Sequence, residues 1–302
     1  PQTVGLKSAA AFVASVAQSS ELQARVLGQG VGLRDEFNVC LNELNNAIGQ
    51  ENMILLQGLQ QLKYPQEHLW SLLDDASYRS TLSDMPPKDR ARLHSLAGQH
   101  ACDFLHVVPI PGLGLTTSSA NYSTTVRRLL GLEVFLFDQR CPACNSATLD
   151  KYGHHAVGCG FGGERIRRHK EMCDFIASTM RKAGWEVELD KEDVLAEVSD
   201  GAMINKRPAD IYVHRWRGAQ HAAFDLSVIC PTGASNYVRA AVEPGYSCAK
   251  RDGEKLQKYL QACQEAHIHF APLSCESYGR WSETALDIFH RVVEVLRKKA
   301  RF

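Results

Sequence analysis

The chain has 302 residues, of which 44% are hydrophobic and 23% are charged, a composition typical of a folded protein. Its 34 Lys and Arg residues balance 34 Asp and Glu residues, which excludes a uniformly basic nucleic-acid coat and leaves only local patches. No apolar run reaches the roughly 18 residues of a membrane helix, and no export signal is present, so we expect no membrane association. The ten cysteines are therefore expected as reduced, intracellular thiols.

Residues 1–130 have the pattern of a helical bundle. Apolar residues recur at three- and four-residue steps, and turns separate the resulting segments. One such turn is Met85-Pro86-Pro87, where Ser83 or Asp84 is in position to cap the next helix. No catalytic constellation is evident in this region.

From residue 164 to residue 302 helices and strands alternate. The predicted elements are a helix to about Lys182, strands Trp185–Leu189, Asp210–His214 and Ala222–Cys230, a helix Asp252–Glu265, a strand Ile268–Leu273, and a helix from Glu283 towards Arg297. This order is typical of an α/β domain. We therefore expect a multi-part α+β chain with a helical bundle, a small knuckle at 131–163 and an α/β domain.

Cysteines and histidines within residues 131–163 are spaced like a zinc site. Cys141 and Cys144 form a Cys-x2-Cys pair, which places two thiolates on one tight turn, and Cys159 follows in a glycine-rich stretch. Either His154 or His155 is in reach as the fourth ligand. Four such ligands suit tetrahedral zinc and leave no position for water, so the prediction is a structural zinc site.

Two aspartates in predicted strands indicate a metal site of another kind. Asp210 and Asp225 both stand among apolar residues on consecutive strands. Burying a carboxylate in a strand is costly unless a cation compensates it, so the pair predicts a divalent cation such as Mg²⁺. Such an ion can activate water and stabilise the charge that develops on a phosphate during hydrolysis.

A lysine is expected beside these acids. Position 227, two residues after the second acid, is Ser227 and cannot supply the charge. The following helix offers Lys255 or Lys258, and Tyr259 lies one turn after Lys255 on the same face. The choice between the two lysines stays open. Weaker candidates for a further acid are Glu171, Asp174 and Asp190.

The densest basic cluster directly follows the predicted knuckle. Its members are Arg165, Arg167, Arg168, His169 and Lys170. A cluster of this kind can neutralise phosphates, so it predicts a contact with nucleic acid, to which we also assign Lys258. The flanking acids Glu164 and Glu171 dilute its field.

In their order along the chain, these motifs resemble the C-terminal region of non-LTR retrotransposon polyproteins that carry a restriction-like endonuclease. The motifs are Cys-x2-Cys, Gly-His-His-Ala, Gly-Gly-x4-Arg-His, Arg-Pro-Ala-Asp, Phe-Asp-Leu-Ser-Val and Lys-x2-Lys-Tyr. Residues 4–10 are similar to the segment after the reverse-transcriptase palm, and the helices to residue 130 are similar to the thumb and linker. The polymerase aspartates are not in this chain, so no polymerisation is expected of it.

The resemblance implies a CCHC zinc knuckle beside a PD-(D/E)xK nuclease that nicks chromosomal DNA for target-primed reverse transcription. It implies Asp210 and Asp225 as ligands of Mg²⁺ or Mn²⁺, Lys255 as a displaced lysine with Tyr259 as its companion, and His155 as the zinc histidine. The implied partners are target DNA, element RNA and the reverse-transcriptase domain of the same polyprotein, and the implied location is the nucleus. The alternative is a catalytically silent nucleic-acid-binding or assembly module.

Overall fold

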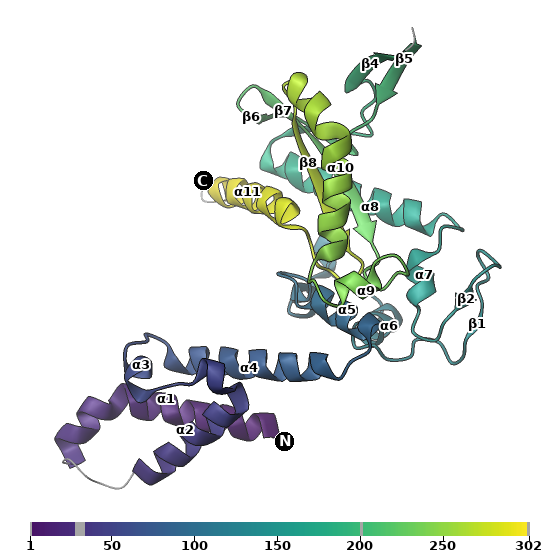
Figure 1. Cartoon of the computed structure of the whole chain (residues 1–302). Coiled ribbons are helices and arrows are strands. Elements are labelled where there is room, and N and C mark those ends of the chain that lie inside the picture. Colours follow the sequence, from purple (N-terminus) through teal and green to yellow (C-terminus); the bar gives the residue numbers. More distant parts are fainter. Residues whose placement is uncertain (1, 28–33, 200–201, 301–302) are drawn as a thin grey trace. The chain divides into compact units, whose positions relative to one another are not determined.

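The computed structural model describes residues 2–27, 34–199 and 202–300, and its contacts divide the chain into two compact units, residues 1–85 and 86–302 (Figure 1). The division falls inside the predicted break Met85-Pro86-Pro87. It does not fall near residue 130, the predicted end of the helical region. Residues 86–130 belong instead to the unit that contains the sheet.

The first unit is a helical bundle, as its apolar periodicity predicts. Its helices are α1 (Gln2–Leu27), α2 (Arg34–Ile48), α3 (Leu56–Gln60) and α4 (Pro65–Ser83), with a 3-10 turn at Gln50–Asn52. Val13, Leu44 and Leu69 are buried in its core. The Asn45 side chain donates to the carbonyl of Ile54 at 3.2 Å and accepts from its N–H at 2.8 Å, which holds the loop after α2 in place.

Short helices lead from the break to the knuckle within the second unit. They are α5 (Pro87–Leu96), 3-10 turns at Asp103–Leu105 and Pro111–Leu113, and α6 (Ser119–Leu129). The prediction that Ser83 or Asp84 caps the helix after the break is wrong, because Pro86 occupies that position and makes no side-chain cap. The Arg280 guanidinium donates to the carbonyl of His94 at 3.1 and 2.8 Å, which ties α5 to the sheet-containing part of the unit.

The larger sheet has four strands in the order β3–β6–β7–β8. They are β3 (Glu186–Leu189), β6 (Ile211–Arg217), β7 (Gln220–Ile229) and β8 (His269–Glu276). The first two pairs are antiparallel, and β7 and β8 are parallel. All four predicted strands are confirmed, although β8 continues beyond its predicted end at Leu273. A hairpin of β4 (Leu195–Ser199) and β5 (Ala202–Lys206) was not predicted.

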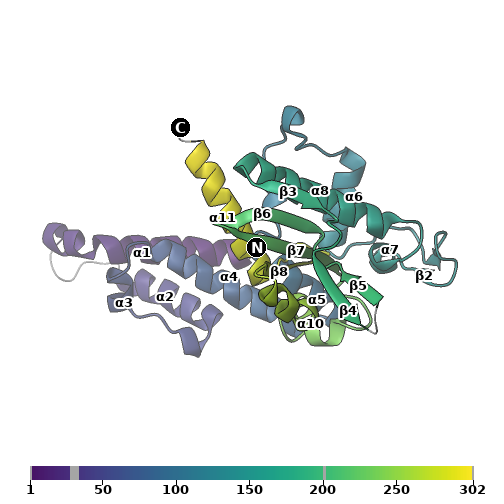
Figure 2. The ribbon, with the colours of Figure 1, turned by 90° about the horizontal axis from the view of Figure 1, so that it is seen from above.

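Helices cover both faces of this sheet, so the unit is a mixed α/β structure (Figure 2). The helices α8 (Glu164–Ala183) and α11 (Glu283–Lys299) pack on one face and α10 (Tyr246–Glu265) on the other, with the short α9 (Tyr237–Ala240) before it. Along β7, Phe224 and Leu226 lie under α8 and α11, whereas Ala223 lies under α10. Because side chains alternate along a strand, Asp225 lies on the α10 face.

Candidate metal centres

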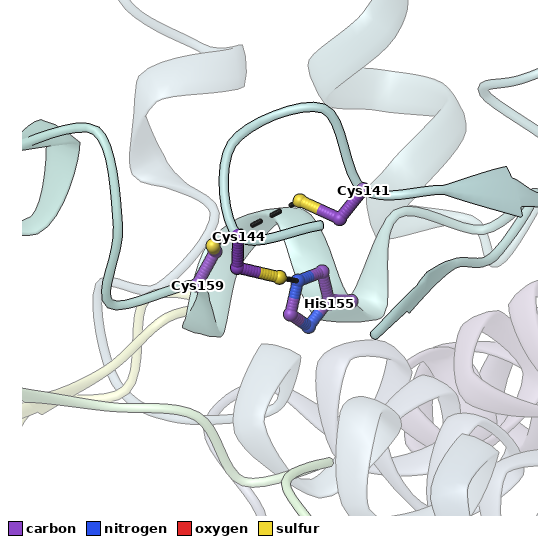
Figure 3. Close-up of side chains that lie close together, drawn as sticks. All are labelled: Cys141, Cys144, His155 and Cys159. Atoms are coloured by element: carbon purple, nitrogen blue, oxygen red, sulfur yellow. Dashed lines mark hydrogen bonds between the residues drawn. The ribbon is translucent and has the colours of Figure 1, made fainter. Parts of the chain in front are cut away.

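The knuckle cluster, defined as Cys141, Cys144, His155 and Cys159, brings four ligand atoms within 4.8 Å of one another. The Sγ atoms of Cys141 and Cys159 are 3.9 Å apart, and Cys144 Sγ lies 3.3 Å from His155 Nε2. Figure 3 shows the four side chains pointing toward one another. Zinc–sulfur bonds of about 2.3 Å in a tetrahedron place sulfurs about 3.8 Å apart. The cluster could therefore hold a metal ion and is compatible with zinc.

Tight backbone turns between short elements build this cluster. The elements are β1 (Gln139–Arg140), β2 (Thr148–Leu149) and α7 (His154–Gly158). The N–H of Asn145 donates to the carbonyl of Cys141 at 2.8 Å, which closes the Cys-x2-Cys turn. Gly153 is the N-cap residue of α7 with φ +76°, and a Cβ there would lie 3.1 Å from a methyl of Val134. Glycine is therefore required at this position.

The two histidines of the knuckle have different partners. Asp150 accepts from the backbone N–H of His154 and of His155, each at 3.2 Å, and it also contacts Nδ1 of His154 at 2.9 Å. His154 is thus held by a carboxylate, while His155 joins the cysteines. Hydrogen bonds with the side chain and backbone of Ser146 lower the pKa of Cys144 to about 5, which favours the metal-binding thiolate.

Asp210, Asp225 and Lys255 line a single cleft of about 860 Å³ in the second unit. Nζ of Lys255 donates to both carboxylate oxygens of Asp225, at 2.8 and 2.6 Å. Only 7% of the Asp225 side chain and 17% of the Lys255 side chain are exposed. Burial raises the pKa of Asp225, the Lys255 ammonium opposes this rise, and the charge of Asp210 adds to it.

Asp210 stands directly before β6 and reaches both β7 and α8. Its N–H donates to the carbonyl of Phe224 at 3.0 Å, and its Oδ2 accepts from the N–H of Leu226 at 2.7 Å. Nε2 of His169 lies 3.3 Å from the same oxygen. Hydrogen bonding to Asp210, with a further contribution from Cys173, raises the pKa of His169 to about 11, so the ring is an imidazolium at neutral pH.

The donor chemistry of the cleft fits a divalent cation. Asp210 and Asp225 supply the hard oxygen ligands that Mg²⁺ and Mn²⁺ prefer, and a dication would stabilise the Asp225 carboxylate against the burial and the Asp210 charge that raise its pKa. His169, Cys173 and Asp210 form a further group whose ligand atoms lie within 4.8 Å of one another, but His169 as an imidazolium has no free nitrogen lone pair and would have to lose a proton before it could bind a metal ion. The sequence did not predict that Cys173, a buried residue one helical turn after His169, lies beside Asp210 in this group.

The predicted basic cluster divides between the cleft and the open surface. Arg165, Arg168 and His169 line the cleft. Arg167 is exposed and pairs with Glu164 and Glu171 instead. Lys170 is exposed and is not among the cleft-lining residues of the described chain. The weaker candidates for a further acid are also exposed and outside that lining: Glu171, Asp174 and Asp190.

Two further residues of α10 were predicted at this site, Tyr259 as the companion of Lys255 and Lys258 as the alternative lysine and a nucleic-acid contact, and neither lines the cleft in the part of the chain that the structure describes. Tyr259 is 7% exposed and packs on Phe270, with the ring centroids 5.6 Å apart. Lys258 is exposed, and its Nζ lies 4.7 Å from the centre of the Tyr259 ring. The geometry thus distinguishes Lys255, which contacts Asp225, from Lys258, which does not.

Lys250 and Arg251 line the cleft but were not identified from the sequence. Arg251 Nε lies 3.3 Å from the hydroxyl of Ser227, the residue at the position where a lysine was expected. Both were missed because α10 begins at Tyr246, before the predicted start at Asp252. The signal was present, since Arg251 and Lys255 are four residues apart and so share a helix face.

Comparisons with known proteins found no protein-family model and no curated protein that matches the chain. Function must therefore be argued from the geometry of the site. Across the described residues, no helix combines the length and the apolar composition needed to cross a membrane.

Proposed function

We propose that the chain is a divalent-metal-dependent DNA endonuclease with a restriction-like domain of the PD-(D/E)xK type. The observation that carries this proposal is the contact of Lys255 with both oxygens of the buried Asp225, in a cleft that Asp210 also lines. These are the two acids and the lysine that such a site requires, with the lysine supplied by α10 because position 227 is a serine.

The charges around the cleft suit a phosphodiester backbone. Five Lys and Arg side chains line it, against three carboxylates. The cations are Arg165, Arg168, Lys250, Arg251 and Lys255, and the acids are Asp210, Asp225 and Glu254. This local excess of positive charge attracts a polyanion even though the whole chain is neutral.

Each of the three central residues has a distinct role in this proposal. Asp210 is oriented by the N–H of Leu226, and Asp225 is oriented by Lys255. The two carboxylates would hold a divalent cation, which would supply Lewis acidity and a water of lowered pKa as the nucleophile. The Lys255 ammonium, which contacts Asp225, would stabilise the negative charge that develops on the phosphoryl oxygens.

In the polyprotein context that the motifs suggest, the cut would be a nick in target DNA that primes reverse transcription. Element RNA and the reverse-transcriptase domain are then the partners, and the reaction takes place in the nucleus. The knuckle cluster would hold a structural zinc ion and position nucleic acid beside the cleft.

The test is nicking of supercoiled plasmid with Mg²⁺ or Mn²⁺ by the wild type and by Asp225→Asn. We expect nicked circles from the wild type and a loss of at least about 100-fold in the variant, which removes the negative charge while keeping the side-chain shape. Asp174→Asn is the matched control, because Asp174 is an exposed acid outside the cleft lining. Equal nicking by wild type and Asp225→Asn would reject the site.

A second candidate is a nucleic-acid-binding module that no longer cuts. It is favoured by the complete ion pair between Lys255 and Asp225, which satisfies the buried acid without a metal. Retained binding to DNA or RNA, with no nicking by any variant under either metal, would support this candidate.

A further inference from the structure

A second cavity in the sheet-containing unit, separate from the cleft, combines aromatic rings with cations. It has a volume of about 530 Å³ and lies among α5, α6, α9 and the knuckle loop. Its lining includes Lys88, Arg92, Arg128, Tyr152, Tyr237 and Tyr278, and we call this site the tyrosine cavity. Its volume falls in the range of about 300–1,000 Å³ that is usual for ligand pockets.

The floor of the tyrosine cavity is built from planar groups held by hydrogen bonds. The Arg128 guanidinium lies 4.2 Å from the ring centre of Tyr278 and donates to the carbonyl of Ser277 at 3.0 Å. The Arg92 guanidinium donates to the carbonyl of Leu129. It packs so closely against Gly131 (φ +71°) that a Cβ there would lie 2.6 Å from Arg92 Nη2.

Two tyrosines are accessible in the walls, each with a lysine beside its ring. Tyr152 is 37% exposed and Tyr237 is half-buried, whereas Tyr278 is covered. Nζ of Lys88 lies 5.8 Å from the ring centre of Tyr237, and Nζ of Lys151 lies 5.3 Å from that of Tyr152. Lys151 pairs with Glu133 and lies outside the cavity lining, whereas Lys88 lines the cavity. A ring with such a cation beside it is suited to stack a nucleobase while the cation contacts its phosphate.

The acids of the tyrosine cavity are already engaged by protein groups. Asp89 pairs with Arg92 at 3.1 Å. Asp150 accepts from the N–H groups of Tyr152, His154 and His155. Their negative charge is therefore locally compensated, and an anionic ligand meets little repulsion.

The tyrosine cavity and the cleft share a wall. Asn236 and Ser277 line the cleft, and the residues that directly follow them, Tyr237 and Tyr278, line the tyrosine cavity. A polynucleotide strand that continued from the cleft into the tyrosine cavity would pass these two adjacent residue pairs.

We propose that the tyrosine cavity binds an unpaired nucleotide of a DNA or RNA strand, with the base stacked on Tyr237 or Tyr152 and a phosphate beside Lys88. Base recognition by stacking requires the nucleotide to be unpaired, since both faces of a duplex base are covered by its neighbours. The continuity of this strand with the cleft rests on the proposed nuclease function, whereas binding in the tyrosine cavity does not.

The experiment measures fluorescence anisotropy of the full chain, without added divalent metal, with a short labelled DNA strand. Matched probes are the same sequence as RNA, as duplex, and as a strand of abasic sites. We expect at least one of Tyr237→Leu and Tyr152→Leu, the one that removes the ring on which the base stacks, to raise Kd for the single strand at least fivefold, given the roughly 5- to 150-fold value of one stacked base. Tyr237→Phe keeps the ring and should stay within about twofold, as should Tyr122→Leu, which changes an exposed tyrosine of α6 outside the tyrosine cavity.

Three results would overturn the proposal: equal affinity for the abasic strand, a loss below fivefold in both leucine variants, or an equal loss on duplex. If a leucine variant fails to fold, Lys88→Ala replaces it and should lower the salt slope of single-strand binding by about 0.7. An unchanged slope would then count against the site. Tighter binding of the RNA or of the DNA probe identifies which strand the tyrosine cavity prefers. The nicking test needs added divalent metal and the binding test does not. Failure of the proposed nuclease function and failure of the tyrosine cavity are therefore distinguishable.

Discussion

The knuckle cluster and the cleft lie in the same compact unit, but their anionic groups are compensated differently. In the knuckle, three cysteines and His155 converge around a point that suits a tetrahedral metal ion. In the cleft, the buried Asp225 is paired with Lys255 at 2.6 Å. We therefore expect the fold of the knuckle to depend on metal, whereas the cleft is assembled by the protein alone and would use metal only for chemistry.

The largest effect expected from this difference is on zinc content. Cys144→Ser replaces a thiolate by a weak ligand, and a site with three good ligands holds zinc poorly. We expect purified wild-type protein to contain about one zinc per chain and the variant to contain a small fraction of that. Elemental analysis after dialysis measures both.

The control for this prediction is Cys102→Ser, because Cys102 lies outside the knuckle cluster among the described residues. It should leave zinc content unchanged. Full zinc content in Cys144→Ser, or absence of zinc from the wild type after expression with zinc present, would contradict a structural zinc site.

The second expected effect is on stability and concerns the ion pair of the cleft. Lys255→Met leaves Asp225 buried without its partner, which should lower the free energy of unfolding by about 3–5 kcal/mol. The double variant Asp225→Leu/Lys255→Met removes both charges and should recover most of that loss. Urea unfolding of both variants without added divalent metal gives the comparison.

Lys258→Met is the matched control on the same helix. Lys258 is exposed and has its cation beside the ring of Tyr259, so its replacement should change the free energy of unfolding by no more than about 0.5 kcal/mol. Equal costs for Lys255→Met and Lys258→Met would mean that the pair with Asp225 does not stabilise the fold.

The knuckle and the cleft also differ in how much of each could be predicted from the sequence. The knuckle ligands lie between Cys141 and Cys159, so their spacing alone indicates a common site, and the structure adds the selection of His155 over His154 through Asp150. The strands and the main helices of the α/β part followed from their periodicity, whereas the face of β7 on which Asp225 lies became clear only from the packing of Ala223 and Phe224 in the structure.

The parts that were not predicted depend on contacts between distant segments. That residues 86–130 join the sheet-containing unit depends on pairs such as Arg280 with His94, which no local pattern reveals. Tyr259 shares the predicted helix with Lys255 but turns into the apolar layer against Phe270. Helix α10 starts earlier than predicted, directly after its N-cap residue Gly245 (φ +83°), and this start places Arg251 within the helix. The composition of the sequence does not specify this backbone geometry.

The smallest expected effect is the pH dependence that His169 contributes in the absence of divalent metal. Its folded-state pKa of about 11 lies above the ordinary value, so its stabilising contribution is fully present below about pH 6.5 and is lost as the pH rises through 11. His169→Gln should therefore lower the urea midpoint most near about pH 6 and less near about pH 10. The side chain is 36% exposed and solvent screens its pairing with Asp210, so this effect should be well below that of Lys255→Met. In an Asp210→Asn background the pH dependence of His169→Gln should disappear. If His169→Gln in the otherwise wild-type chain lowered the urea midpoint equally at both pH values, the ring would not be held as an imidazolium by Asp210.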